Sequence, residues 1–228
     1  MSAEGGVERE ESDAGRGPAR VLVCFALEEE AGAFKKIAAG EAEVSILITG
    51  IGRKNAENAV RESLKTFSPH WMLTCGFAGG LNPVLATGNV IAATEDAILG
   101  ARLLGAGAKR AKFVCAARIA TTIKEKQELR RTTGADAVEM ESEAIHAVCR
   151  EHGIPCATVR VISDTANENL PLDFNQLARP DLSLDYGKLA WAIARSPGKI
   201  GALLRLQKNC RLAAGQLAGT LAKVIWPR

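Results

Sequence analysis

The chain has 228 residues, of which 47% are apolar and 24% are charged. This length and composition are those of one soluble α/β domain with a sizeable core. Lys and Arg exceed Asp and Glu by only three, and aromatic residues make up 4% of the chain. Because nucleic-acid binding needs a basic face and stacking platforms, we expect no nucleic-acid partner.

Six cysteines are scattered along the chain without a Cys-x-x-Cys pair, and the three histidines stand at no metal-ligand spacing. We therefore expect reduced thiols in the core and no metal site. Residues 1–19 are rich in Gly, Glu, Ser and Arg and lack an apolar segment, which predicts a disordered tail rather than a secretory signal. No apolar run reaches about 18 residues, so we expect no membrane-spanning helix and a cytoplasmic protein.

From residue 20 onward, apolar runs rich in β-branched residues alternate with helical patterns. This alternation predicts an α/β fold, a three-layer αβα sandwich with a mixed central sheet, formed by a single domain over residues 20–228. Strands are expected near 20–27, 43–49, 70–75, 88–94, 111–119 and 156–162. Helices are expected near 28–38, 53–67, 122–132, 139–152 and 185–195, with a long C-terminal helix over about 199–225.

Glu30 is the first candidate site residue, in the helix that follows the first apolar strand. At helical spacing it shares a face with Phe34 and Ile37, while Glu28 points away from that face. The helix macrodipole favours acidic residues in any first turn, which explains the run of glutamates. It does not explain why one of them lies on the apolar side.

Two glycine-rich segments follow. Gly50 and Gly52 resemble the start of a dinucleotide fingerprint, but the third glycine is missing, so a nicotinamide site and a redox dehydrogenase are disfavoured. The segment Gly76–Gly80 is expected to form a turn after the third strand, where backbone N–H groups could approach a ligand closely. Tight turns need glycine anyway, so a purely structural turn is the alternative.

Glu141 is the second candidate. In a helix that begins near Glu139, it lies on the same face as Ile145 and Val148, whereas Glu139 and Glu143 fall on the opposite, solvated side. An ionised carboxylate on an apolar face needs a polar partner. That partner is a ligand, the backbone, or a buried cation such as the nearby arginine of the strand near 156–162.

Asp164 is the third candidate, where the strand near 156–162 gives way to a polar loop. In open α/β sheets, ligands bind outside the carboxyl ends of the strands. Glu30 and Asp164 both follow strands, and Glu141 follows a short Ala137–Val138 segment that could be another, so parallel strands would bring the three carboxylates to one edge. An Asp in this position can equally cap a helix.

The C-terminal helix carries basic residues between apolar ones at helical spacing. Most helices of this kind cover the sheet or a subunit interface. A basic amphipathic helix can also lie on a membrane surface, which leaves a peripheral membrane contact as an alternative.

The chain from Arg20 to about Phe174 resembles the superfamily of purine nucleoside phosphorylases and methylthioadenosine/S-adenosylhomocysteine nucleosidases. The resemblance rests on four blocks in the family's order, Ala26–Glu30, Thr49–Gly52, Gly76–Gly80, and Val138–Glu141 together with Ile162–Asp164. The final third, in Leu170–Leu172 and in the turn Arg195–Gly198, resembles the hopanoid-associated phosphorylase branch.

The resemblance implies cleavage of the N-glycosidic bond of a purine nucleoside, with a 5′-substituted adenosine as the expected substrate. It implies that Asp164 protonates the purine as a general acid and that Glu30 positions and deprotonates water. Glu141 would bind the ribose hydroxyls, Met140 would pack against the sugar, and Ser163 would orient Asp164. The remaining residues expected around the substrate are Glu139, Phe77, Ala78, Gly79, Arg118 and Ile119. The resemblance also implies a homo-oligomer that needs no cofactor.

The sequence departs from the family pattern at the phosphate site. Phosphorylases hold phosphate with an arginine loop and a serine in the glycine segment, and here Glu30 and Phe77 stand in such places. Water is therefore favoured over phosphate as the nucleophile, with phosphate remaining a possible co-substrate. Arg118 stands where nucleosidases carry an aromatic residue, and its guanidinium plane could stack on the base. A nucleoside-binding protein of the same fold without turnover is the alternative function.

Overall fold

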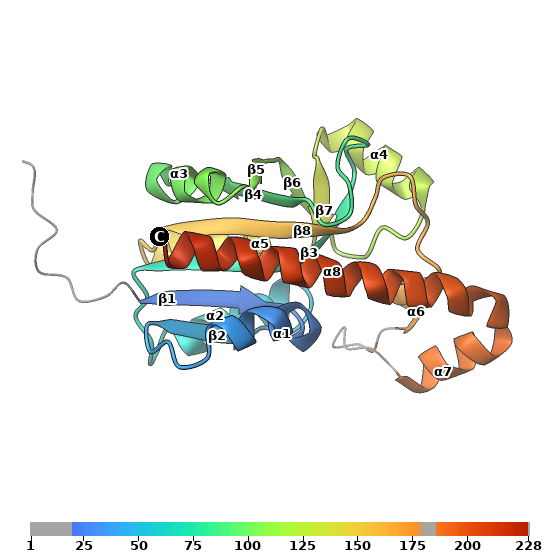
Figure 1. The fold of residues 1–228 in the computed structure, drawn as a ribbon, viewed down its shortest axis with the longest axis horizontal. Helices are drawn as coiled ribbons and strands as arrows, with labels where there is room; N and C mark the ends of the chain where they lie inside the picture. Colours follow the sequence, from blue (N-terminus) through green and yellow to red (C-terminus); the bar gives the residue numbers. More distant parts are fainter. Residues whose placement is uncertain (1–19, 178, 180–185, 228) are drawn as a thin grey trace, which may run out of the picture.

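A computed structural model describes residues 20–177, 179 and 186–227 of the protein. The predicted disordered tail, residues 1–19, lies outside the described residues. Figure 1 shows helices on both faces of a central sheet, which confirms the predicted three-layer α/β architecture. The long C-terminal helix runs across one face of that sheet and continues past its edge.

The sheet is mixed, as predicted. Its main path has the order β2-β1-β3-β8-β4-β5, and β7 and β6 extend it beside the end of β3. Strands β1, β2, β3 and β8 are parallel, whereas β4 runs antiparallel to β8 and β7 antiparallel to β3. The strands are β1 Val21–Phe25, β2 Val44–Ile48, β3 Trp71–Gly80, β4 Val90–Thr94, β5 Lys109–Arg110, β6 Phe113–Cys115, β7 Ala137–Glu139 and β8 Cys156–Asp164.

The helices form the two outer layers. The described helices are α1 Glu28–Ile37, α2 Arg53–Ser63, α3 Ala97–Gly105, α4 Ile123–Thr133, α5 Ser142–Glu151, α6 Phe174–Leu177, α7 Tyr186–Arg195, the 3₁₀ turn η1 Pro197–Lys199, and α8 Ile200–Ile225. Residues of α1, α3 and α8 share one apolar cluster with the strands, and residues of α2 and α5 share another. Among the described residues, no helix is both long and apolar enough to cross a bilayer.

Strand β1 shows why both faces are covered. Val21, Val23 and Phe25 belong to the cluster with α1 and α8, while Leu22 and Cys24 belong to the cluster with α2 and α5. Successive side chains of a strand point to opposite faces, so a continuous apolar run needs a helix on each side. The ends of β1, β3 and β8 are thereby fixed at one edge of a rigid sheet.

The structure corrects several predicted elements. Helix α3 was not predicted, because its two glycines lower helix propensity, although Asp96 caps it by accepting the Leu99 N–H at 2.8 Å. The predicted strand over 111–119 is limited to the short β6. The segment Gly76–Gly80 is not a turn but the last part of β3, which pairs there with both β8 and β7.

The helix expected from Glu139 begins instead at Ser142. Glu139 is instead the last residue of β7, a strand that the sequence indicated only as a short Ala137–Val138 segment. β7 runs antiparallel to β3 rather than parallel to it. The segment after β7 therefore reaches the sheet edge from the opposite direction to β1 and β8.

Candidate active site

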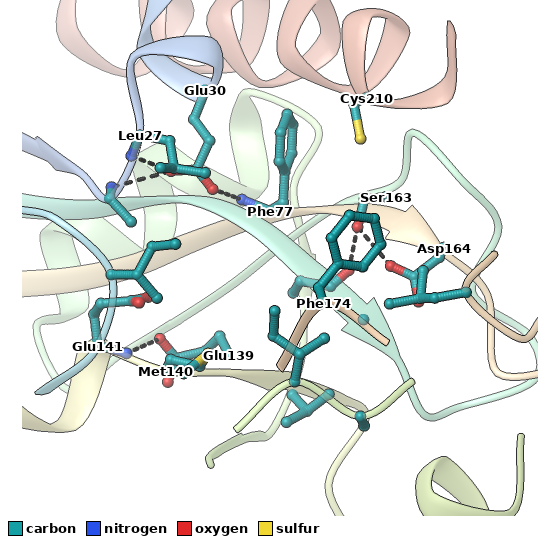
Figure 2. Close-up of a pocket in the computed structure, with 18 of the residues that line it drawn as sticks. Leu27, Glu30, Phe77, Glu139, Met140, Glu141, Ser163, Asp164, Phe174 and Cys210 are labelled. Atoms are coloured by element: carbon teal, nitrogen blue, oxygen red, sulfur yellow. Dashed lines mark hydrogen bonds between the residues drawn. The ribbon is translucent and has the colours of Figure 1, made fainter. Parts of the chain in front are cut away.

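A cavity of about 250 Å³ lies at the edge where β1, β3 and β8 end. Figure 2 shows Glu30 and Glu141 on one side of it and Asp164 on the other. All the site residues predicted from the sequence line this cavity, namely Glu30, Phe77, Ala78, Gly79, Arg118, Ile119, Glu139, Met140, Glu141, Ser163 and Asp164. The structure thus brings together residues that lie up to about 130 positions apart in the chain.

Glu30 is held by backbone N–H groups from two parts of the chain. Its Oε2 accepts the N–H groups of Ala26 and Leu27, each at 3.0 Å, and its Oε1 accepts the N–H of Phe77 at 2.8 Å. Burial raises the pKa of the Glu30 carboxyl to about 7, although the Arg160 guanidinium and the hydrogen bonds act in the opposite direction. Glu30 therefore caps its own helix and can also exchange a proton near neutral pH.

Gly76 gives the charged groups room beside β3. Its φ is +146°, and a Cβ atom built on it would lie 2.6 Å from both Arg160 Nη1 and Glu30 Oε1. The glycine is thus required by the close approach of these two side chains rather than by a turn.

Arg160 is the cation at the centre of the carboxylates, on β8 and only 1% exposed. Its Nη2 lies 2.6 Å from Glu139 Oε2 and 3.3 Å from Glu141 Oε2, and its Nη1 donates to the Cys75 carbonyl at 3.0 Å. Its Nε has no hydrogen-bond partner in the structure. One guanidinium therefore compensates several buried negative charges, which water would otherwise have to solvate.

Glu139 corrects a prediction. It was expected on the solvated side of a helix but is 4% exposed, since the strand β7 delivers it to the interior. Its carboxylate accepts the hydroxyl of Ser142 at 2.7 Å as well as the Arg160 guanidinium. Burial favours the neutral carboxyl, but Arg160 and the Ser142 hydrogen bonds outweigh burial and lower its pKa. Glu143 is exposed, as predicted, and pairs with Arg53.

Glu141 is buried, as predicted, but as the residue that precedes α5 rather than as part of its apolar face. Its Oε1 accepts the N–H of Gly52 at 2.8 Å, and its Oε2 approaches Arg160. Both structural partners considered from the sequence, the backbone and the buried arginine, are therefore present. Burial raises the pKa of Glu141 above its usual range despite the opposing effect of Arg160.

Asp164 ends β8 and faces the cavity. Its Oδ1 accepts the Ser163 hydroxyl at 2.7 Å, and its Oδ2 accepts the ammonium of Lys126 at 2.5 Å. The next helix begins only at Phe174, so the alternative that Asp164 caps a helix is wrong. Asp164 is instead fixed by two polar side chains at the rim of the sheet.

The chain that carries this cavity matches a known protein family. The phosphorylase superfamily matches residues 24–102 and 97–193, which is more than half of the chain. The chain belongs to the phosphorylase superfamily. It is accordingly an enzyme of the nucleosidase and nucleoside phosphorylase kind, as the sequence resemblance predicted.

Individual proteins of this superfamily resemble the chain at low sequence identity. A 5′-methylthioadenosine/S-adenosylhomocysteine nucleosidase from Shewanella halifaxensis is 26% identical over 169 residues, which cover 59% of this chain and 74% of the relative. Among solved structures, such a nucleosidase from Neisseria meningitidis superposes with a TM-score of 0.69 at 18% identity, covering 91% of this chain and 98% of the other. Futalosine hydrolase from Helicobacter pylori gives 0.65 at 16% identity, with 90% and 98% covered.

This member of the superfamily has site residues that the sequence did not reveal. Phe174 projects over the cavity beside Ser163, and Cys210 points into it from α8 (Figure 2). Leu206, one turn before Cys210, lines the same wall. Phe174 begins the short helix α6, and the other two lie in a long helix with ordinary periodicity, so only the structure could place them at the site.

The cations of the site are already paired. Arg118, the only cationic side chain among the described residues that line the cavity, is 65% exposed at its side chain and forms an ion pair with Glu125. Behind the cavity wall, Arg160 and Lys126 are enclosed by carboxylates and carbonyl oxygens. Among the described residues, no group of His, Cys, Asp and Glu side chains could hold a metal ion.

Proposed function

We propose that the enzyme hydrolyses the N-glycosidic bond of a purine nucleoside, a 5′-substituted adenosine, and releases the free base. The observation that carries this proposal is the buried Glu30 carboxylate facing Asp164 across one cavity, with a pKa of about 7 that suits a general base. The names of the relatives, which are nucleosidases for methylthioadenosine and S-adenosylhomocysteine or a futalosine hydrolase, support the same reaction class.

The reaction needs one proton acceptor and one proton donor. Glu30 takes a proton from water as the water oxygen bonds to the anomeric carbon. The electron pair of the breaking C–N bond passes to the purine, and Asp164 gives a proton to a ring nitrogen of that leaving base. The two carboxyl groups lie on different sides of the cavity in Figure 2, which leaves room for the sugar between them.

The other lining residues provide binding. Glu141 accepts hydrogen bonds from the ribose hydroxyls, and Met140 packs against the sugar. Phe174, placed beside Ser163 and Asp164, offers an aromatic face to the base. Arg118 is the alternative stacking partner, provided that its ion pair with Glu125 opens. No cofactor is required for this chemistry.

Water is preferred to phosphate because a phosphate dianion needs unpaired cations. Arg118 is paired at the surface, and Arg160 and Lys126 are enclosed. Phosphorolysis is the second candidate, supported by the resemblance of Leu170–Leu172 and of the turn after α7 to the hopanoid-associated phosphorylases. In that case the substrate would be an adenosylated lipid precursor.

The test is the release of free base from adenosine, methylthioadenosine and S-adenosylhomocysteine, with and without phosphate, resolving ribose from ribose 1-phosphate. We expect free sugar regardless of phosphate. Glu30→Gln and Asp164→Asn should each lose at least about 100-fold in kcat, whereas Glu28→Gln, on the exposed side of α1, should change little. Strict phosphate dependence would establish phosphorolysis. Nucleoside binding by calorimetry without any base release would establish a non-catalytic binding protein instead.

We propose that the enzyme is a cytoplasmic homo-oligomer. The resemblance to a family of dimers and higher oligomers supports this assembly. Sedimentation velocity over a range of concentrations tests it, with a single monomeric species at every concentration as the contrary result.

A peripheral membrane contact is a separate proposal. Residues 186–228 contain no Asp or Glu, and exposed apolar side chains alternate with exposed basic ones on the outer side of α8. We expect co-sedimentation with vesicles of phosphatidylglycerol and phosphatidylcholine, weakened by the pair Lys199→Glu and Lys208→Glu. The pair Lys36→Glu and Lys54→Glu, on other helices, is the control. Equal binding by both pairs would contradict the contact.

A further inference from the structure

Lys126 is a buried cation in a helix that is otherwise largely polar. It is 0% exposed, and it is the only buried residue of α4, a helix in which the other residues are half-buried or exposed. Its position in the first turn of the helix places a positive charge at the positive end of the macrodipole. An unpaired ammonium in the interior is strongly unfavourable, so the reason for its burial lies in what it contacts.

All three donors of the Lys126 ammonium are used. Nζ lies 2.5 Å from Asp164 Oδ2, 2.6 Å from the Thr165 carbonyl and 3.0 Å from the Glu168 carbonyl. One contact is therefore made to the proposed general acid and two to the loop that follows it.

The loop that Lys126 binds also forms the cavity wall. The N–H of Leu170 donates to the Thr121 carbonyl at 2.8 Å, and the N–H of Ile123 donates to Asn169 Oδ1 at 2.8 Å. Leu170 itself lines the cavity. The start of α4 and the loop after β8 are thus fastened together, with Lys126 at the point where this junction meets Asp164.

We propose that Lys126 is the positioning residue of the leaving-group proton donor: its ammonium fixes Asp164 and stabilises the carboxylate that remains after the proton has passed to the base. This inference rests on the proposed function. The Ser163 hydroxyl and the Lys126 ammonium bind different oxygens of Asp164, so the carboxyl group cannot rotate away from the cavity. Negative charge develops on Asp164 as the C–N bond breaks, and a fixed buried cation is most effective at such a point.

No other charged or titratable group described around Asp164 takes the positioning role that we assign to Lys126. From α8, Cys210 presents a thiol whose pKa is raised to about 11 by burial and then by the negative charges of Asp164 and Glu30, so it stays neutral. Arg205, also on α8, is exposed and lines a neighbouring hollow. The carboxylate of Glu168 accepts the N–H of Thr165 rather than facing Asp164.

The test compares two leaving groups in Lys126→Met and Lys126→Arg. An adenine nucleoside needs a proton on the departing base, whereas p-nitrophenyl β-riboside releases a stable phenolate without one. We expect kcat for the nucleoside to fall at least about 10-fold in Lys126→Met, with kcat for the nitrophenyl riboside changed less than about 3-fold. Lys126→Arg, which keeps the charge, should recover part of the loss.

The separation of kcat from KM gives a second readout that does not depend on the nitrophenyl substrate. Lys126 contacts Asp164 but does not line the cavity, so Lys126→Met should lower kcat for the nucleoside while KM changes less than about 3-fold. Lys124→Met, an exposed lysine of the same helical turn, should leave both kcat and KM unchanged.

Two results would overturn the inference. Equal losses with both leaving groups, or a rise in KM as large as the fall in kcat, would reduce Lys126 to a structural ion pair. If Lys126→Met fails to fold, Lys126→Gln keeps a hydrogen-bond donor without the charge and must show the same pattern. A wild-type enzyme that cleaves no nucleoside at all would instead refute the proposed function, and this inference with it.

Discussion

Replacing Arg160 by methionine tests whether one guanidinium holds the buried carboxylates together. The side chain is 1% exposed and contacts Glu139 at 2.6 Å and Glu141 at 3.3 Å. Removing one partner of a buried ion pair costs about 3–5 kcal/mol. The variant also lacks the buried Nε of Arg160, which has no hydrogen-bond partner, and its removal adds back about 1 kcal/mol or more to the free energy of unfolding. We therefore expect a net loss of about 3 kcal/mol in the free energy of unfolding at pH 8.

The loss should depend on pH with a definite sign. Glu30 has a pKa raised to about 7 and Glu141 is also raised, so the folded state binds protons that the unfolded state has already lost between the ordinary value of 4.5 and about 7. Ionisation of these groups lowers stability as pH rises through that interval. Without Arg160 the charged forms are less compensated still, so the destabilisation by Arg160→Met should be smaller at pH 5 than at pH 8.

Urea unfolding of wild type and Arg160→Met at the two pH values measures these differences. Arg53→Met is the matched control, because Arg53 makes only an exposed ion pair with Glu143 and should cost less than about 1 kcal/mol. Adding Glu139→Gln to Arg160→Met should recover part of the lost stability. A loss below about 1 kcal/mol at pH 8, or the same loss at both pH values, would refute the reasoning.

Three further predictions concern single positions. The kcat/KM for nucleoside cleavage should rise as pH increases through about 7, because Glu30 accepts a proton only when ionised; a flat acidic limb in a pH–rate profile would contradict this. Gly76→Ala should lower the free energy of unfolding by about 2 kcal/mol in urea, since its Cβ would meet Arg160 and Glu30, whereas Gly32→Ala in α1 meets nothing and should be neutral or stabilising by about 1 kcal/mol. Phe174→Ala should raise KM about 5-fold to 10-fold with little change in kcat, and an unchanged KM would exclude stacking on the base.

The sequence predicted the convergence of Glu30, Glu141 and Asp164 because strand ends are readable from apolar runs. The parallel strands β1 and β8 carry Glu30 and Asp164 to one edge of the sheet, whereas Glu141 reaches that edge after β7, which runs antiparallel to β3. The prediction for Glu139 was wrong because the helical wheel included residues that lie before the start of the helix. Helix α5 begins at Ser142, so the three residues before it do not follow a helical period.

Other features depend on tertiary contacts that no local pattern encodes. Gly76 looked like a turn residue, but it pairs with β8 as part of β3, and the side chains of Arg160 and Glu30 occupy the space that its Cβ would need. Lys126 stands among charged residues in a polar helix, so its burial depends entirely on where the loop after Asp164 lies. Phe174 belongs to that same region, whose course is set by its bonds to the start of α4.

Helix α8 gives the cavity one wall that takes no part in holding the carboxylates. Leu206 and Cys210 reach the cavity from this helix, while Glu30 and Asp164 are fixed by the sheet and its loops. Substitutions on two successive turns of α8 can therefore alter the shape offered to a nucleoside without touching the reacting groups. The shape of this wall and the hold on the two carboxyl groups thus depend on separate elements of the fold, so either can be varied by substitution without the other.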